Sequence, residues 1–336
     1  MTSRELVYQT LEFRNNTGKV PRELWTLPWA ENTYPEQFAD IIRDYPNDIV
    51  TVKPRYYEEF KVRSGDMYSP GEYIDEWGCK FNNVQEGIIG EVKEPIVQDE
   101  DWDDYDKVHI PEELLSFEIE EVNEYCANTD KFVMAGFYPR PFEQLQFIRG
   151  TENLYVDLML RPENLFVFLE KMHDFYCRML EKWGQTDVDA LMLMDDWGTQ
   201  NSLLINPKLW EEIFKPMYKD YINIAKKYNK KVFMHSDGNT SSIIPHLIEI
   251  GLDAINTQIF CMDMDELEQY KGEITFWGEI DRQHILPRGS VEDVKKAVEK
   301  VQDHFWENGG VIAQCEFGPG AKPENVKAVF EKWAQY

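Results

Sequence analysis

The stretch VFMHSDGNT, residues 232–240, ends an apolar run in side chains that can bind a metal or move a proton. His235 and Asp237 are two positions apart, so in a continuing strand their side chains point to the same side. Cys315 ends another apolar run, and imidazole, carboxylate and thiolate together can hold zinc with an open fourth position. Glu279 is a candidate for that fourth position. The pattern predicts a metal site, although a hydrogen-bonded histidine and a buried cysteine are the commoner uses of these residues.

Four other apolar runs end in polar residues in the same way. They are followed by Asp195, Asp196 and Trp197, by Asn256 and Gln258, by Glu279 and Asp281, and by Gln314, Cys315 and Glu316. In parallel α/β folds, functional residues gather at the carboxyl ends of the strands, so we expect one shared pocket. A carboxyl group there can act as an acid or a base, and Asp196 and Glu316 are the catalytic candidates. Asp195 and Asp196 are adjacent, so only one of them faces the pocket if the strand continues.

Further side chains near these ends are candidates for substrate binding. They are Trp25, Trp29, Tyr138, Asp195, Trp197, Asn239 and Gln258. Aromatic walls with a few polar groups are typical of small-molecule sites. Core packing is the alternative use of the tryptophans, and helix capping or loop solvation is the alternative use of the aspartates.

The elements that position these residues alternate between short apolar runs and long amphipathic segments from about residue 130 onward. This order predicts βα units around a parallel sheet. The predicted strands are residues 23–30, 48–54, 131–137, 190–197, 231–236, 253–258, 274–279 and 310–317. Eight strands favour a (β/α)₈ TIM barrel, with an elaborated N-terminal third, over a doubly wound open sheet. No linker or repeat divides the chain, so we expect one barrel domain over residues 1–336.

Composition restricts the partners. The chain has 62 acidic and 35 basic residues and a formal net charge of −27, which repels nucleic acid and anionic membrane surfaces. Its five cysteines are widely spaced, and neither an export signal nor a membrane-length apolar run occurs, so we expect a soluble, cytoplasmic protein without disulfides. Glycine-rich nucleotide loops, His-Glu-x-x-His and Gly-x-Ser-x-Gly motifs are absent. Nucleotide-driven chemistry, hydride transfer and serine hydrolysis are therefore disfavoured.

The chain resembles the uroporphyrinogen decarboxylase superfamily, and within it the cobalamin-dependent methyltransferase branch, in five stretches. These are DEWGCKF (75–81), MDDWGTQNSLLINPKLWEEIFKPMY (194–218), HSDGNTSSIIPHLIEIGLDAIN (235–256), WGEIDRQHILPRGSVEDVKKAV (277–298) and GGVIAQCEFGPGAKPEN (309–325). The resemblance covers nearly the whole chain. It implies a (β/α)₈ barrel with the active site at the carboxyl-terminal mouth.

The resemblance also implies a zinc ion held by a His-x-Cys-Gly motif and a distal cysteine. His235 matches the histidine, Gly238 the glycine and Cys315 the distal cysteine, whereas Asp237 stands in the place of the first cysteine. Aspartate offers a harder oxygen donor than a thiolate and changes the Lewis acidity of the metal. The Asp-x-His-x-x-Gly signature of a corrinoid-binding module is absent, so cobalamin is expected on a separate corrinoid protein.

The expected function is metal-assisted methyl transfer. The methyl group would move between a small methylated substrate (a methoxylated or N- or S-methyl compound) or a thiol and the corrinoid of the partner protein. Two alternatives stay open: a metal-free lyase of the decarboxylase type, with Asp195 or Asp196 as the acid or base, and a non-catalytic barrel that binds a tetrapyrrole or corrinoid. The early arginine-rich segment of the decarboxylases is not matched, because Arg22 is the only arginine before Trp25 and Trp29 in this segment.

Overall fold

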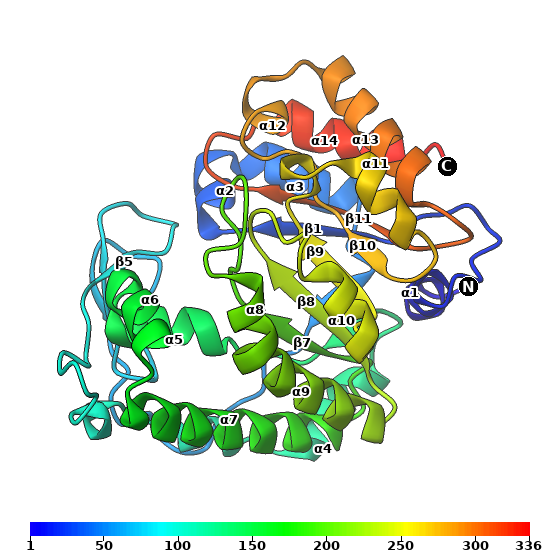
Figure 1. The fold of residues 1–336 in the computed structure, drawn as a ribbon. Helices are drawn as coiled ribbons and strands as arrows, with labels where there is room; N and C mark the ends of the chain where they lie inside the picture. The colour runs from blue at the N-terminus through cyan, green and yellow to red at the C-terminus, as the bar shows by residue number, and fades with distance from the viewer.

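In the computed structural model, which describes residues 1–336, eight parallel strands form a nearly closed barrel with helices around it (Figure 1). The barrel strands are β1 (Arg22–Thr26), β2 (Ile49–Thr51), β6 (Phe132–Met134), β7 (Ala190–Met194), β8 (Lys231–Ser236), β9 (Ala254–Thr257), β10 (Thr275–Trp277) and β11 (Val311–Phe317). They pair in the order β1-β11-β10-β9-β8-β7-β6-β2. The predicted (β/α)₈ barrel is confirmed.

All eight predicted strands are present, but most are shorter than predicted. Only β8 has the predicted bounds, 231–236. The predicted strand 23–30 ends early because α2 (Pro28–Thr33) begins at Pro28, whose fixed φ suits a first helical turn. The predicted strand 190–197 ends at Met194, and the polar residues that follow it leave the sheet to form the mouth of the barrel.

Fourteen α-helices pack around and beside the strands. They are α1 (Ser3–Leu11), α2 (Pro28–Thr33), α3 (Pro35–Asp44), α4 (Ile119–Ala127), α5 (Pro141–Arg149), α6 (Thr151–Leu160), α7 (Glu163–Gly184), α8 (Pro207–Leu209), α9 (Lys215–Lys227), α10 (Ile244–Ile250), α11 (Met264–Leu267), α12 (Ile285–Arg288), α13 (Val291–Phe305) and α14 (Pro323–Trp333). At the start of α13, for example, Ser290 and Asp293 form a reciprocal capping box, in which each side chain accepts from the backbone N–H of the other residue. No helix has the length and apolar character that a membrane crossing requires.

The core has two layers because side chains alternate along each strand. In β11, Ile312 belongs to the apolar cluster inside the barrel, and Val7 of α1 belongs to the same cluster. Ala313, Cys315 and Phe317 belong to the larger cluster between the strands and the helices. By this alternation, Gln314 and Glu316 point to the barrel side.

The barrel closes between β1 and β2 partly through side chains. Asp48 N–H donates to Arg22 O (2.8 Å), and Arg22 N–H donates to the carboxylate of Asp48 (2.9 Å). The buried Leu24 N–H donates to Asn47 Oδ1 (2.8 Å). Asn47 and Asp48 thus provide acceptors that a ladder between the two strands would otherwise provide.

Residues between β2 and α4 leave the barrel and form an insert. It contains a three-stranded antiparallel sheet of β3 (Gly71–Ile74), β4 (Lys80–Asn83) and β5 (Glu91–Glu94), which Figure 1 shows beside α5 and α6. Asp75 builds the β3–β4 turn, because its Oδ1 accepts from Trp77 N–H (3.0 Å) and Cys79 N–H (2.7 Å). This insert is the elaborated N-terminal third expected from the sequence.

We predict that Asn47→Ala lowers the free energy of unfolding by about 1–3 kcal/mol, because the buried Leu24 N–H loses its acceptor. Urea denaturation followed by circular dichroism measures the change. Asn32→Ala is the matched control, since Asn32 is exposed and its side chain makes no hydrogen bond. Equal stabilities of the two variants would contradict a role for Asn47 in closing the barrel.

Candidate active site

The site lies at the mouth of the barrel, where the segments after β7 and β8 contact each other. Gly198 N–H donates to Asp237 O (3.0 Å), and Asn239 N–H donates to Thr199 O (2.7 Å). A Cβ on Gly198 would lie 2.4 Å from Asn239 N, and Gly238 has a φ of 78° and lies against the Gly198 backbone. The two glycines allow this contact, which fixes the positions of the carboxylates beside them.

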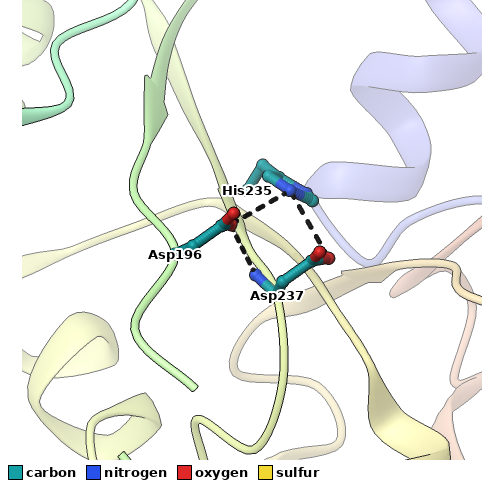
Figure 2. Close-up of side chains that lie close together, drawn as sticks. All are labelled: Asp196, His235 and Asp237. Carbon is teal, nitrogen blue, oxygen red and sulfur yellow. Dashed lines mark hydrogen bonds and ion pairs between the residues drawn. The ribbon is translucent and has the colours of Figure 1, made fainter. Parts of the chain in front are cut away.

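Asp196, His235 and Asp237 form the cluster at this mouth, and their side chains point toward one another (Figure 2). His235 Nε2 lies 3.5 Å from Asp196 Oδ1 and 3.6 Å from Asp237 Oδ1. Asp237 N–H also donates to Asp196 Oδ1 (3.0 Å). One ligand atom from each residue lies within 4.8 Å of the other two, a spacing that suits a shared cation.

Asn256 orients the imidazole. It is the β9 residue in register with His235 on β8, and its Oδ1 lies 2.6 Å from His235 Nδ1. Its amide nitrogen donates to Trp277 O (2.5 Å), so the amide oxygen faces the histidine. Nδ1 is therefore the donor, and Nε2 is the ring nitrogen directed at the two carboxylates, as in metal sites with an oriented histidine.

The cluster favours positive charge at its centre. Burial disfavours the imidazolium, but the hydrogen bond and charge of Asp196 and the charge of Asp237 outweigh it and raise the pKa of His235 to about 9. Burial also acts against ionised Asp196, but His235 holds the pKa of Asp196 below its usual value. Burial raises the pKa of Asp237. A proton or a metal ion beside Nε2 would satisfy these groups.

Arg282 lies among three carboxylates at the same mouth. It forms ion pairs with Asp237 and Glu316, and its Nε lies 3.3 Å from Glu279 Oε1. Asp237 Oδ2 is thus engaged, whereas Asp237 Oδ1 is buried without a hydrogen-bond partner. Glu279 Oε1 is also buried without a hydrogen bond, and the ion pair with Arg282 is its polar contact. Burial raises the pKa of Glu279 to about 8. An unpartnered carboxylate oxygen beside His235 Nε2 fits a cation ligand.

Cys315 does not join this cluster, in contrast to its predicted place as a metal ligand. It belongs to the outer core cluster and lies fully buried, between Gln314 and Glu316 on the strand. Burial raises the pKa of its thiol, which disfavours the thiolate that metals bind. The third member of the cluster beside His235 and Asp237 is Asp196, which was predicted as a catalytic residue. Glu279 also lies outside the three-residue cluster and contacts it through Arg282.

Asp195 and Trp197, predicted to bind substrate, are fully buried. The Asp195 carboxylate accepts from Phe142 N–H (3.1 Å), Glu143 N–H (2.7 Å) and the Tyr218 hydroxyl (2.5 Å). Two of these donors belong to the first turn of α5, so Asp195 satisfies the start of that helix. Trp197 stacks on Phe142 with ring centroids 4.1 Å apart. Of the two adjacent aspartates, Asp196 lies at the barrel mouth, whereas Asp195 is buried and binds the start of α5 and the Tyr218 hydroxyl.

The other predicted binding residues are spread around the mouth. The ring of Trp25 lies 5.1 Å from that of His235, whereas Trp29 packs against Tyr34 and Phe317. Asn239 is engaged within the loops, since its Nδ2 donates to Cys261 O (3.2 Å).

Gln258 and Tyr138 line separate cavities. Gln258 accepts from Gly238 N–H (3.2 Å) and, with Glu279 and Arg282, lines a small cavity. Tyr138 lines a larger cavity on the insert side, together with Glu143. The mouth is therefore bordered by a cavity on either side.

Asn256 was expected in the shared pocket from its place after an apolar run, but without a role, and Arg282 was not expected there. Asn256 lies within the predicted strand 253–258, and the parallel register of β8 and β9 places it beside His235. Arg282 is the one cation in the segment GEIDRQ, and only the three-dimensional structure brings Asp237 and Glu316 to it.

We predict that Asp195→Ala lowers the free energy of unfolding by about 2–4 kcal/mol, because it leaves two buried N–H groups and a buried hydroxyl without their acceptor. Asp196→Ala should cost less, since this side chain is 38% exposed and water can replace it. Chemical denaturation of both variants measures the difference. A larger loss in Asp196→Ala would contradict this division between the two aspartates.

Comparison with known proteins agrees with this architecture. The sequence profile described as uroporphyrinogen decarboxylase (URO-D) matches residues 73–336. No curated protein matches the sequence. A solved structure described as a methyltransferase from Methanosarcina mazei is similar over 100% of this chain and 99% of its own, with a TM-score of 0.71 and 13% identity. A solved endo-β-1,4-xylanase structure from Gloeophyllum trabeum is less similar, since the match covers 65% of this chain and 81% of that chain with a TM-score of 0.39 and 9% identity. The match over most of its length places this chain in the uroporphyrinogen decarboxylase family.

Proposed function

We propose that this protein is a methyltransferase that moves a methyl group between a small methylated molecule, or a thiol, and the corrinoid of a partner protein. The observation that carries this proposal is the oriented His235, whose Nε2 faces Asp196 and Asp237 at the barrel mouth. The likeness in fold to a methyltransferase, over the whole chain, is consistent with it. A metal-free lyase and a binding-only barrel are the alternatives, in which a protonated His235 would lie beside Asp237 Oδ1.

Asp196, His235 and Asp237 would hold a metal ion, and zinc suits one imidazole and two carboxylates with an open position. When bound, zinc supplies a Lewis acid that polarises an oxygen, nitrogen or sulfur atom of the substrate. Arg282 holds Asp237 Oδ2, so Asp237 would offer its other oxygen alone. Two carboxylates and a neutral imidazole would leave the metal less electron-rich than two thiolates would, which favours polarisation of an oxygen centre.

The chain's own residues would orient the substrate and manage charge. Trp25, beside the His235 ring, offers an apolar wall against which a methyl-bearing group can lie. Glu316 lies at the end of β11, paired with Arg282 and partly exposed. It would give a proton to a substrate atom that loses its methyl group, or take the proton from an atom that gains one. Arg282 balances the negative charge of this side of the site.

The metal proposal predicts about one zinc ion per chain, strongly reduced in His235→Ala and retained in Cys315→Ala. Elemental analysis after purification, and again after chelation and reloading, measures the stoichiometry. Cys315→Ala is the control because its sulfur faces the outer core. Loss of zinc in Cys315→Ala with retention in His235→Ala would assign the metal to a different set of residues.

The activity proposal predicts that the zinc-loaded protein moves a methyl group from a methoxylated aromatic or a methylamine to free cob(I)alamin, or from methylcob(III)alamin to a thiol, for one class of a panel of these compounds. The absorbance change of the cobalamin reports the transfer. Asp196→Ala and Asp237→Ala should lower the rate at least about 100-fold, because each removes a direct ligand. Metal-independent release of carbon dioxide from a carboxylated substrate would favour the lyase instead. Binding of a corrin without any turnover would favour the binding-only barrel.

A further inference from the structure

A second cavity, of about 570 Å³, lies between the insert and the end of β6. Nine of its 20 lining residues are aromatic, among them Tyr56, Tyr73, Trp77 and Phe137. The insert supplies most of the lining, and the segment after β6 supplies the rest. Aromatic walls pack well against flat rings and offer less to a small, strongly hydrated cation.

The inner end of this cavity reaches the barrel mouth. Tyr138 lines the cavity and also packs, like Trp25, against the apolar cluster inside the barrel. Glu143 lines the cavity too, and the charges of Asp196 and His235 act on it. Asp196, His235 and Asp237 themselves do not line the cavity, so a molecule that fills it meets the barrel mouth at Tyr138 and Glu143.

Cations line the same cavity on its exposed side. Lys53 and Arg63 are exposed, and neither has a carboxylate within ion-pair distance, in a chain with a net charge of −27. The guanidinium of Arg63 lies 3.7 Å from the centroid of the Phe60 ring, which holds it against the insert. Of the three acidic lining residues, Asp75 is hydrogen-bonded within its own turn and Glu143 is paired with Arg140. The third, Glu76, is partly buried and forms no ion pair, so the carboxylate of a ligand would have to lie on the side of Lys53 and Arg63 and away from Glu76.

We propose that this cavity binds a flat aromatic molecule bearing a carboxylate, with its ring among the insert aromatics and its carboxylate near Lys53 and Arg63. Its opposite end would carry the methyl group, as a methyl ether directed at Tyr138 and Glu143. This last point rests on the proposed function, because it assumes that the barrel mouth removes or adds the methyl group. The binding of the ring and the carboxylate does not depend on that function.

The test is titration calorimetry of the purified protein with three probes: 4-methoxybenzoate, the neutral 4-methoxybenzyl alcohol and the non-aromatic cyclohexanecarboxylate. We expect the benzoate to bind most tightly. The double variant Lys53→Met with Arg63→Met should weaken the benzoate roughly tenfold and leave the alcohol almost unchanged, since only the first loses a charge contact. Lys208→Met, at an exposed lysine on α8, is the control and should bind like the wild type.

A second variant tests the aromatic wall. Phe137→Leu keeps the apolar character and removes the ring, so it should weaken both aromatic probes by a few-fold and leave the affinity for cyclohexanecarboxylate nearly unchanged. Equal affinity for all three probes, or an unchanged benzoate affinity in the double variant, would overturn the proposal. Tight benzoate binding without methyl transfer would uphold the cavity assignment and contradict the proposed methyltransferase, so the two failures are distinguishable.

Discussion

The parallel register of β7, β8 and β9 is the constraint on which the site depends. It sets Met194 beside His235 and His235 beside Asn256, so the polar residues that follow β7 and β8 leave the sheet at one level. A slip of one residue in either pairing would turn His235 toward the outer core and remove Asn256 from its ring. Gly198 and Gly238 then allow the two departing segments to touch, which holds Asp196 and Asp237 on either side of the imidazole.

The second constraint on the site is the balance of charge among the side chains that the strand register brings together. Four carboxylates, those of Asp196, Asp237, Glu279 and Glu316, gather at this mouth with one imidazole and one guanidinium. Such a group of acids in a partly buried place is unfavourable unless cations accompany it. Arg282 neutralises one side permanently, and the space beside His235 Nε2 is where a further positive charge is most stabilised. The protein itself therefore supplies a permanent positive charge at only one side of the cluster, that of Arg282.

Much of the fold was predictable from the sequence, and less of the site. Apolar runs that alternate with amphipathic segments reflect burial, so the eight barrel strands and their sequence along the chain were predictable. Strand ends could not, because Pro28 and the residues after Met194 leave the sheet for reasons of local geometry. Likewise His235, Asp237 and Asp196 could be found as polar endings of apolar runs. The outward direction of Cys315 depends on the alternation within β11, which the match to a family motif does not reveal.

The strands of the insert, β3, β4 and β5, form a sheet of their own that does not pair with the barrel strands. The cavity lining from Lys53 to Ile89 is therefore encoded apart from the cluster, whose residues lie between Asp196 and Asp237. Substitutions in the insert can change the shape of the cavity without altering the strand register that holds His235. The insert side of the cavity and the cluster at the barrel mouth are therefore set by different parts of the chain, and the sequence of one can change without displacing the other.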